Sequence, residues 1–552
     1  MSRQTSRHRN FWTPILFFLL LIIGVFIGFQ LNKYIGAKRP ITTVIERNDR
    51  LEELINLIND RYVDTVNTDS LYQDAITGIL GHLDPHTVYI PAFEAAAMTA
   101  GLKGEFKGIG IEALNIQDTF RISRIWPNSP ADEAGLQLGD GLIAIDSSPV
   151  VSRSLNIDDL KKMFAAKDRS SMTLVIARPG DTAIKYLTVK KGIVPIYSIS
   201  AQYMINDHTG YIRIARFSAI TYREFKKALG KLQHSGMKQL ILDLRGNPGG
   251  YVDAATAIAD EFLNNHRLIV YTKGRRTPRE DFYADQNGIF EKGRLAVLID
   301  AGTASAAEIL TGAIQDWDRG IVLGTRSFGK GLVQQQYELG DGSLLRLTIA
   351  RYYTPSGRCI QRPYNNGKLA YEQAYLKRLY HPEDIKAPDT SDVVHKQYYS
   401  LVFHRILYGG GGIMPDINMA QNPAFSEEDM LKITSERWID DIIFNYYLRH
   451  FKKLNELKSA NALSRQAQVP DYVLDQLKLK ADMSYPEAAY ILWQNPLALD
   501  YLRRQMKASL IRLMLGGNAY FQFINQNDEV MKKAVKTLDS PEYLTIIEGK
   551  AA

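Results

Sequence analysis

Three polar side chains lie where their chemistry could support acyl transfer. Ser305 stands in the first turn of a helix predicted to open at Thr303, directly after an apolar strand predicted over residues 295–300. Lys330 follows the next predicted strand, residues 320–324, and Gln334 comes four residues later. A serine needs a base to become nucleophilic, and a lysine whose pKa is lowered by burial can replace histidine in that role. Ser305 is therefore a candidate nucleophile, Lys330 its candidate base, and Gln334 a candidate for orienting the lysine.

A simpler interpretation of Ser305 is a helix cap, which is the most common role of serine at a helix start. Thr303 is already available as that cap, however, which leaves Ser305 among alanines. The sequence contains no Gly-x-Ser-x-Gly elbow, and none of its ten histidines stands in a triad context. His82 and His86 fall in an early helical region and are expected to be structural.

Backbone amides could supply the charge stabilisation that acyl transfer requires. A strand-to-helix turn such as the one before Ser305 exposes free amides at the positive end of a helix. A second source is the turn Arg245-Gly246-Asn247-Pro248-Gly249-Gly250, which follows a strand predicted at 239–244. This segment is either an ordinary turn or the other half of an oxyanion hole.

A nucleotide-binding loop is the main alternative at Lys330. Residues 324–330 satisfy the first seven positions of the P-loop pattern, Gly-x4-Gly-Lys, after a predicted strand. The eighth position is Gly331, whereas a P-loop needs a Ser or Thr hydroxyl there for magnesium. We therefore expect no nucleotide at this loop.

The composition bounds the class of protein that must position these groups. The 552 residues suffice for three or four domains, and 45% hydrophobic with 23% charged residues is typical of globular chains. The single cysteine, Cys359, excludes an intramolecular disulfide and a Cys-cluster metal site. The net charge of +7 comes from 67 basic and 60 acidic residues without a basic stripe, so no nucleic-acid partner is expected.

The first forty residues differ from the rest. Arginines precede an apolar run over residues 11–29, whose 19 residues would span about 28 Å as a helix, just enough to cross a bilayer core. A cleaved signal peptide is the alternative, but no convincing small-x-small site follows. The sequence thus favours an uncleaved N-terminal anchor in contact with the membrane through residues 11–30.

Four regions with different sequence patterns follow the predicted anchor. Apolar residues at helical spacing predict helices up to about residue 103, and short strands with glycine turns predict a compact module from 104. From about 193, strands alternate with helices, including strands at 239–244, 295–300, 320–324 and 344–353, which predicts an α/β core. Beyond residue 420 the chain reads as helical, with a helix over 499–513 that stops at Gly516-Gly517.

Ten short segments in order resemble the carboxy-terminal processing peptidases, also called tail-specific proteases, across roughly residues 50–420. The segments are Leu83–His86, Phe106–Ile111, Ser129–Ala131, Ala134–Leu136, Gly139–Asp140, Asp243–Gly250, Ser305–Glu308, Phe328–Gly331, Tyr352–Gly357 and Gly411–Asp416. The resemblance implies a Ser305 nucleophile, a Lys330 general base and a Gln334 that orients the lysine. It also implies an oxyanion hole from the amides of Ala306 and the Gly249-Gly250 pair, in which Gly250 is preferred and Gly249 stays open.

The same resemblance implies a multidomain α/β protein with a crotonase/Clp-protease-like catalytic core and an inserted PDZ domain. The expected parts are an anchor and tail at 1–40, a helical region at 41–103, the PDZ domain at 104–192, the Ser/Lys peptidase core at 193–420 and a helical extension at 421–552. The amides of Gly108, Ile109, Gly110 and Ile111 would capture the terminal carboxylate of a protein tail, which adds as a strand to the domain edge. In this family the domain selects substrates by their C-termini and can hold the protease inactive until a tail docks.

The expected activity is a serine endopeptidase that cleaves tail-bearing proteins through an acyl-enzyme and requires no cofactor, metal or nucleotide. The resemblance places the catalytic body in the periplasm, on an anchor in the cytoplasmic membrane, and leaves a homo-oligomer or activating partner open. A catalytically silent PDZ scaffold of the envelope is the alternative, although Ser305, Lys330 and Gln334 are all present. Two departures from the family are Ala307, where many relatives carry serine, and an insertion over residues 363–408.

Overall fold

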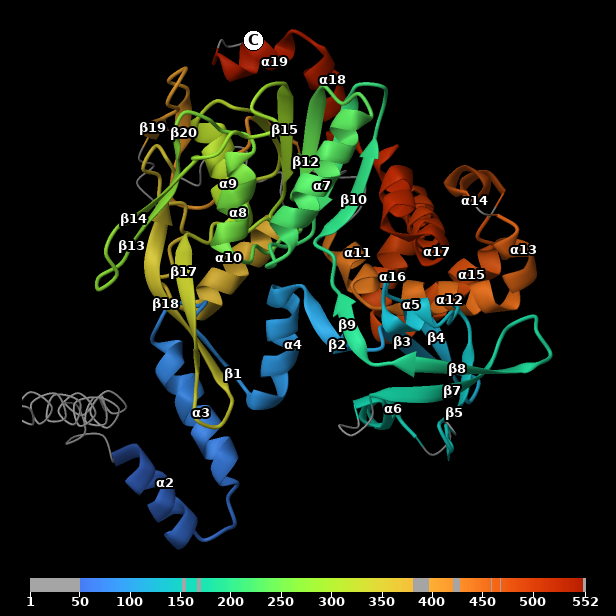
Figure 1. Ribbon diagram of the computed structural model, residues 1–552. Helices are drawn as coiled ribbons and strands as arrows, with labels where there is room; N and C mark the ends of the chain where they lie inside the picture. Colours follow the sequence, from blue (N-terminus) through green and yellow to red (C-terminus); the bar gives the residue numbers. More distant parts are fainter. Residues whose placement is uncertain are drawn as a thin grey trace, which may run out of the picture. The chain divides into compact units, whose positions relative to one another are not determined.

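A computed structural model describes residues 50–150, 155–165, 170–380, 397–419, 427–457, 459–466 and 468–549 (Figure 1). The chain divides into two units, residues 1–82 and 83–552, each of which is described by itself. The first contains helix α2 (Arg50–Arg61) and helix α3 (Thr68–Gly81), as predicted for this region. Asn67 caps α3 by accepting a hydrogen bond from the Ser70 amide at 3.1 Å.

The predicted membrane anchor at residues 11–30 lies outside the described residues. Within the described ranges, no helix combines the length and the apolar character needed to cross a membrane. The longest helix there, α17 (Pro496–Asn525), is interrupted by charges at Arg503, Arg504 and Lys507, whereas a span needs about 20 mostly apolar residues. The predicted localisation, a single N-terminal anchor with the catalytic body in the periplasm, is therefore corrected, because the structure gives it no support.

The second unit is built around a six-stranded sheet in the order β10-β11-β12-β15-β16-β21. Its strands are β10 (Ile199–Met204), β11 (Thr209–Ile214), β12 (Gln239–Asp243), β15 (Arg294–Ile299), β16 (Ile321–Gly324) and β21 (Ile417–Asn418). All neighbours are parallel except the β10–β11 pair. Parallel strands buried on both faces need continuous apolar runs, which is why the sequence located β12, β15 and β16 to within one residue.

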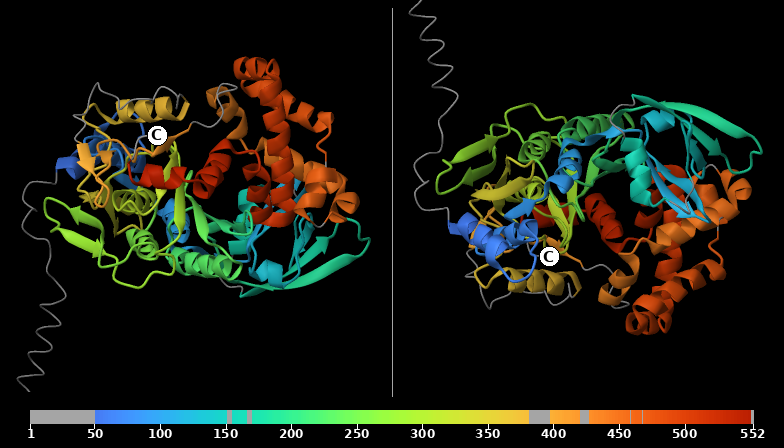
Figure 2. Two further views of the ribbon diagram at one scale, coloured as in Figure 1. Left: turned by 90° about the horizontal axis from the view of Figure 1, so that it is seen from above. Right: turned by 90° about the horizontal axis from the view of Figure 1, so that it is seen from below.

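Helices cover both faces of this sheet (Figures 1 and 2). Alternate strand residues, such as Leu242 and Val297, pack with α7 (Thr221–His234), α8 (Val252–Asp260) and α9 (Ala306–Asp316). The intervening residues, such as Ile241 and Leu298, pack with α18 (Glu529–Asp539) and α19 (Glu542–Ile547). The α/β core is thus confirmed, and the last helices of the chain complete it.

An antiparallel sheet stands beside the central one in the order β1-β18-β13-β14, with β17 also paired to β18. Its strands are β1 (Val88–Ile90), β13 (Leu268–Lys273), β14 (Glu280–Tyr283), β17 (Leu332–Glu338) and β18 (Leu344–Tyr353). Strand β17 carries Gln334, and its partner β18 carries the buried Tyr352.

A separate antiparallel module has its own core, which includes Phe120, Ile122 and Leu174. It contains β3 (Ile111–Ile116), β4 (Thr119–Ile125), β5 (Gly141–Ile145), β6 (Ser148–Pro149), β7 (Ser171–Ala177), β8 (Ile184–Lys190), α5 (Pro130–Glu133) and α6 (Ile157–Ala165). Strand β3 lies at the edge of this sheet, so one of its sides has no strand partner among the described residues. The chain enters the module through β2 (Glu105–Gly108) and leaves through β9 (Gly192–Pro195), which pair with each other. Helix α4 (Ala92–Lys103) precedes β2.

Helices dominate the chain after residue 426, as predicted. They are α11 (Glu427–Thr434), α12 (Trp438–Arg449), α13 (Phe451–Asn455), α14 (Ala460–Gln466), α15 (Asp471–Ser484), α16 (Pro486–Trp493) and α17, followed by α18 and α19. The predicted stop at Gly516-Gly517 is instead a kink inside α17, because Gly516 takes φ 80° and ψ −171° and the helix then resumes. Between core and helices, the insertion forms α10 (Lys368–Tyr380), β19 (Gln397–Tyr399) and β20 (Ile406–Tyr408).

Candidate active site

Ser305 lies at the turn between β15 and α9 with an unusual backbone. Its φ is 56°, a left-handed value that costs a non-glycine residue roughly 1–3 kcal/mol and persists where the surroundings impose it. The helix starts one residue later, at Ala306, so Ser305 occupies the cap position that was expected for Thr303. The Thr303 hydroxyl is instead 2.9 Å from the Leu244 carbonyl oxygen, to which it donates. Ser305 is half-buried, so this residue at the end of the sheet stays partly accessible to solvent.

Lys330 lies in the loop between β16 and β17, at the same end of the parallel sheet as Ser305. Its amine donates a hydrogen bond to Gln334 Oε1 at 2.7 Å. Burial, and secondly the positive charge of Arg346, lower the pKa of Lys330 to about 8, although Asp84 and Glu308 oppose the shift. An amine with this pKa is partly neutral near physiological pH and can accept a proton.

Gln334 is oriented by a residue far away in the sequence. Its Nε2 donates to the His86 carbonyl oxygen, which turns Oε1 toward the lysine. The His86 ring hydrogen-bonds Tyr371 Oη at 3.0 Å, and burial followed by the charge of Lys330 lowers the pKa of His86 to about 4. Expected to be a structural residue of the helical region, His86 therefore also reaches the candidate site as a neutral ring. Its place in the Leu83–His86 segment was the available signal.

Glu308, which sequence reasoning did not single out, joins the two candidate loops. Its fully buried carboxylate accepts the amides of Ser305 at 2.8 Å, Gly329 at 2.7 Å and Lys330 at 2.9 Å, and the Ser327 hydroxyl at 2.5 Å. Burial raises the pKa of Glu308 to about 7, although these four donors oppose the shift. One side chain thus fixes the backbone of the candidate nucleophile against that of the candidate base.

Tyr352 makes a second bridge between the same loops. Its hydroxyl lies 3.1 Å from the Ser305 carbonyl oxygen and 2.6 Å from that of Lys330. Within the described chain, no hydrogen bond joins the Ser305 hydroxyl to the Lys330 amine, which is held by Gln334. The backbones of the serine and the lysine are therefore held against each other by Glu308 and Tyr352.

The nucleotide alternative meets a physical obstacle at the same carboxylate. A P-loop uses its amides to cradle phosphates. Here the amides of Gly329 and Lys330 are donated to Glu308. A phosphate would have to displace a buried carboxylate, so the geometry adds to the argument from Gly331.

The glycine turn after β12 lies against Ser305. A Cβ on Gly249 would come within 2.7 Å of Ser305 Cβ and 3.0 Å of the Ala306 nitrogen, so only glycine fits there. The Gly249 amide donates to Asn247 Oδ1 at 2.8 Å, which engages it within the turn. Gly249 O and the Tyr251 amide both bond Phe217, so the Gly250 amide points to the opposite side of the strand. In the described structure neither the Gly250 nor the Ala306 amide makes an internal hydrogen bond, and both are available to an oxyanion.

The predicted carboxylate loop, residues 108–111, connects β2 to the edge strand β3. The Ile109 carbonyl oxygen accepts the Ala131 amide at 2.9 Å, and the Gly110 carbonyl oxygen accepts the Trp126 amide at 3.1 Å. Gly110 has φ 81°, and a Cβ there would lie 2.3 Å from Ser129 Cβ. The loop is thus pinned by its carbonyl groups next to an open strand edge.

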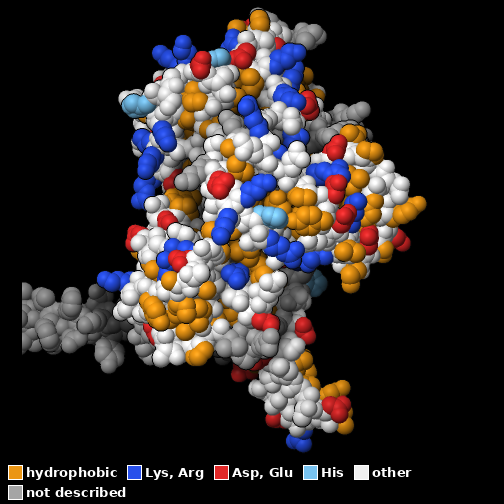
Figure 3. Space-filling model, turned by 90° about the vertical axis from the view of Figure 1, so that its right-hand side faces the viewer, with side chains coloured by type: hydrophobic (Ala, Val, Ile, Leu, Met, Phe, Trp, Pro, Cys, Tyr) orange, Lys and Arg blue, Asp and Glu red, His pale blue; other side chains and the backbone are white. Residues whose placement is uncertain are grey.

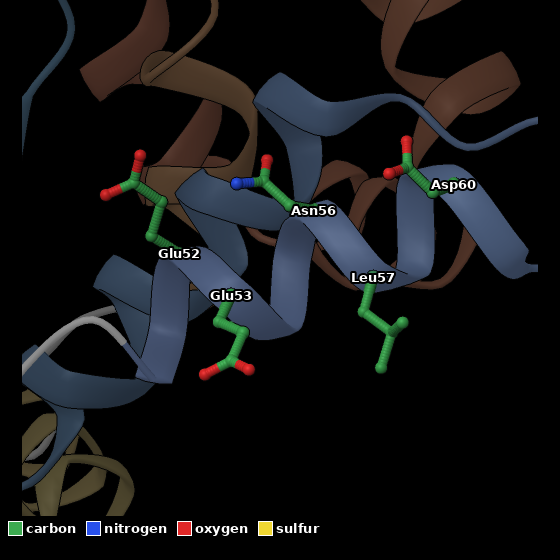
Figure 4. A pocket seen from close by; sticks show the side chains of 5 residues that line it. All are labelled: Glu52, Glu53, Asn56, Leu57 and Asp60. Atoms are coloured by element: carbon green, nitrogen blue, oxygen red, sulfur yellow. The ribbon is translucent and has the colours of Figure 1, made fainter.

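Over the described residues, other surfaces offer no comparable group of side chains. A hollow on α2 is lined by Glu52, Glu53, Asn56, Leu57 and Asp60, all from a single helix (Figure 4). Among the described residues, no group of three or more His, Cys, Asp or Glu side chains is placed to hold a metal ion. On the face in Figure 3, Lys and Arg side chains occur among acidic and apolar ones rather than in one stripe.

Two protein-family profiles match the chain. The one described as Peptidase family S41 matches residues 208–365, and the one described as PDZ domain matches residues 121–178. The first range contains Ser305, Lys330 and Gln334, and the second contains most of β4 and all of β5 to β7.

Individual relatives extend the similarity. The carboxy-terminal-processing protease of Bartonella bacilliformis is 34% identical over 357 residues, which is 62% of this chain and 80% of that protein. The carboxy-terminal processing protease CtpB of Bacillus subtilis is 32% identical over 362 residues, 63% of this chain and 75% of that protein. Among solved structures, the photosystem II D1 C-terminal processing protease is 28% identical, covers 56% of this chain and 89% of its own, and has a TM-score of 0.31.

Proposed function

The chain belongs to the carboxy-terminal processing proteases of peptidase family S41, and from this premise we propose that Ser305 and Lys330 form its catalytic dyad. The observation that carries the proposal is the shared anchoring of the two loops. Glu308 and Tyr352 hold the strained Ser305 against the loop of a half-buried lysine whose pKa is lowered to about 8. Desolvation disfavours the charged form of a lysine, so this position would be unfavourable for a lysine with only a structural role.

The dyad performs acyl transfer in two halves. Neutral Lys330 takes the proton of the Ser305 hydroxyl while Oγ bonds to the scissile carbonyl carbon, whose oxygen becomes an oxyanion. The amides of Ala306 and Gly250 stabilise that charge. Lys330 then passes its proton to the leaving amine as the C–N bond breaks, and an ester on Ser305 remains. In the second half, Lys330 deprotonates water, whose oxygen bonds to the ester carbon. The C–O bond to Ser305 Oγ then breaks, Lys330 returns the proton to Oγ, and the new carboxyl end leaves.

Gln334 keeps the lysine in a productive orientation. Its Oε1 accepts one N–H of the amine at 2.7 Å, which leaves the nitrogen lone pair free to turn toward Ser305. The His86 carbonyl oxygen prevents the amide from flipping, because a flipped amide would face it with a second oxygen. Gln334 is thus a positioning residue that also touches the base.

Substrate selection belongs to the PDZ domain in this proposal. The terminal carboxylate of a protein tail binds the amides of residues 108–111, and the tail adds along the edge strand β3. The proposed parts are the PDZ domain at 104–192 and the peptidase core at 193–420, with helical regions at 41–103 and 421–552. An apolar tail on an unfolded protein is the substrate class that this arrangement fits.

The full chain, incubated with an unfolded protein that ends in an apolar tail, tests the proposal. Unaltered chain, Ser305→Ala and Lys330→Ala run in parallel, each with a free and an amidated tail. We expect cleavage by the unaltered chain alone, weaker on the amidated tail. Tail binding without cleavage by any version would indicate a silent PDZ scaffold, and cleavage that survives both substitutions would refute the dyad.

A further inference from the structure

Helix α18 spans the strand that leads into the oxyanion turn (Figure 1). At the start of the helix, Asp528 binds Arg245, which follows the end of β12. At its end, Asp539 Oδ1 is 3.0 Å from His208 Nε2 and accepts from Gln239, the first residue of β12, at 2.6 Å. Helix α18 and strand β12 have equal lengths, because the 11 residues of the helix and the five residues of the strand both extend over about 16 Å. The two aspartates therefore hold opposite ends of one strand.

The Asp528 contact balances buried charge beside the active-site loop. Asp243, fully buried, is shared by Arg245 at 2.7 Å and Arg213 at 3.2 Å. The second carboxylate comes from Asp528, whose Oδ2 lies 2.6 Å from Arg245 Nη1. Arg504 also lies within electrostatic reach of Asp528. Without the Asp528 charge, the guanidinium groups of Arg245 and Arg213 would face a single buried carboxylate, and an uncompensated buried charge is strongly unfavourable.

Arg245 is the first residue of the turn that carries Gly249 and Gly250. Two positions later, Asn247 accepts the Gly249 amide at 2.8 Å with its side chain and the Ala304 amide at 2.9 Å with its carbonyl oxygen. Ala304 immediately precedes Ser305. A displacement of Arg245 would therefore pass through Asn247 to both halves of the oxyanion hole.

We infer that Asp528, at the start of α18, is a positioning residue which holds the oxyanion turn in place through Arg245. This inference rests on the proposed function of Ser305. It assigns a role to a region that lies outside the matched span of the peptidase family, residues 208–365. Misplacement of catalytic groups by about 1 Å can lower a rate about a hundredfold, so a distant ion pair has leverage on turnover.

The sharpest variant is Asp528→Asn in the full chain. Asp528 Oδ1 caps α18 by accepting the amides of Val530 at 2.9 Å and Met531 at 3.2 Å, and asparagine caps equally well. The substitution thus removes the charge while keeping the helix start. The matched control is Asp539→Asn, which makes the same chemical change at the other end of α18 and β12, away from Ser305.

Three quantities separate positioning from general stability. They are kcat and KM on the unfolded tail-bearing protein, the affinity for a peptide aldehyde whose adduct with Ser305 places an oxygen in the oxyanion hole, and the melting temperature. For Asp528→Asn we expect kcat and aldehyde affinity to fall about ten- to a hundredfold, with KM changed less than about twofold. For Asp539→Asn both should stay within about twofold, and Asp528→Glu should recover part of kcat.

Equal effects of Asp528→Asn and Asp539→Asn on kcat would overturn the inference, as would a loss of kcat with unchanged aldehyde affinity. If Asp528→Asn does not fold, Asp528→Glu carries the test, because it keeps the charge but displaces it by one methylene. If Asp528→Glu melts at the same temperature as Asp539→Asn but has a lower kcat, the result supports positioning. An unchanged kcat in Asp528→Glu contradicts it. Activity in Ser305→Ala would instead refute the proposed function, so the two failures are distinguishable.

Discussion

The peptidase core and the PDZ domain present their functional groups in opposite ways. In the core, the proposed chemistry resides in side chains that are desolvated and held by hydrogen bonds, such as Lys330 bonded to Gln334 and Glu308 bonded to four donors. In the PDZ domain, the proposed binding groups are main-chain amides of residues 108–111 next to an open strand edge. In this proposal, catalysis depends on charged side chains fixed in a desolvated site, whereas tail recognition depends on the conformation of the main chain.

This difference separates the kinetic constants that each region should control. A misplaced charge in the core weakens interactions made in the transition state, and therefore lowers kcat. A weakened amide contact in the PDZ domain loosens substrate binding, and therefore raises KM. This distinction fails if a change in the core alters KM, or if a change in the PDZ domain alters kcat.

The largest effect should come from Glu308→Gln. The amide presents an NH2 group where two of four donors need an acceptor, and a buried donor left unpaired costs about 1–3 kcal/mol. The loops of Ser305 and Lys330 would then separate, so we expect kcat to fall at least about a hundredfold with little change in KM. Steady-state kinetics on the tail-bearing protein measure both constants.

Glu224→Gln is the matched control. Burial raises the pKa of Glu224 too, and its carboxylate accepts the Ser198 amide at 2.7 Å and the Ile199 amide at 3.1 Å, away from the dyad. Both amides bond one oxygen, Oε2, so the amide oxygen of a glutamine can keep them, and the variant should keep both its stability and kcat. A comparable loss of kcat in Glu224→Gln would mean that removing the charge of a buried glutamate away from the dyad suffices to lower kcat.

The sequence allowed much of the core to be predicted, because parallel strands buried on both faces are continuous apolar runs. The strand expected at 344–353 was found at Leu344–Tyr353, and the one expected at 239–244 at Gln239–Asp243. Adjacent parallel strands end at the same sheet edge, so Ser305 and Lys330 were expected near each other. The family assignment from ten short segments was confirmed by relatives whose similarity to this chain extends over most of their own length.

Contacts between distant parts of the chain could not be predicted in this way. Tyr371 meets His86 across 285 positions, and Asp528 meets Arg245 across 283. Local patterns predict helices beyond residue 420, but they do not predict that α18 packs against the central sheet. Gly516 was expected to stop a helix, and only the conformation of the following residues shows that it kinks one.

The next effect concerns pH. Because the neutral amine is the base and the pKa of Lys330 is lowered to about 8, kcat should rise as pH increases through about 8 and level off above it. Gln334→Glu places a negative charge beside the amine, favours its protonated form and raises the Lys330 pKa. The midpoint of the kcat profile should therefore move to higher pH, and kcat measured at pH 7 should fall about tenfold for each pH unit that the midpoint moves.

Gln335→Glu controls for the added charge. Gln335 is the exposed neighbour on β17, so its side chain points to the other face of the strand. Its profile should match that of the unaltered chain. A pH profile of Gln334→Glu that does not move would argue that Lys330 is not the titrating base.

A smaller effect should follow from the substrate tail. Amidation removes the charge that the amides of residues 108–111 are proposed to bind, and hydrogen bonds to charged groups contribute about 1.5–3 kcal/mol. We expect KM to rise about tenfold or more, with kcat unchanged. If amidation lowered kcat at saturating substrate instead, tail docking would also activate the core, and the separation of constants would fail.

The smallest effect should come from Gly135→Ala in the PDZ domain. Gly135 has φ 80°, and a Cβ there would meet no atom within 4 Å, so the substitution tests backbone conformation alone. A left-handed alanine costs about 1 kcal/mol, whereas asparagine tolerates this conformation better. Hydrogen exchange of the PDZ amides should accelerate in Gly135→Ala and less in Gly135→Asn. Turnover of a short peptide without a docking tail should be equal in both, because loosening the PDZ domain leaves Glu308, Lys330 and Ser305 in place.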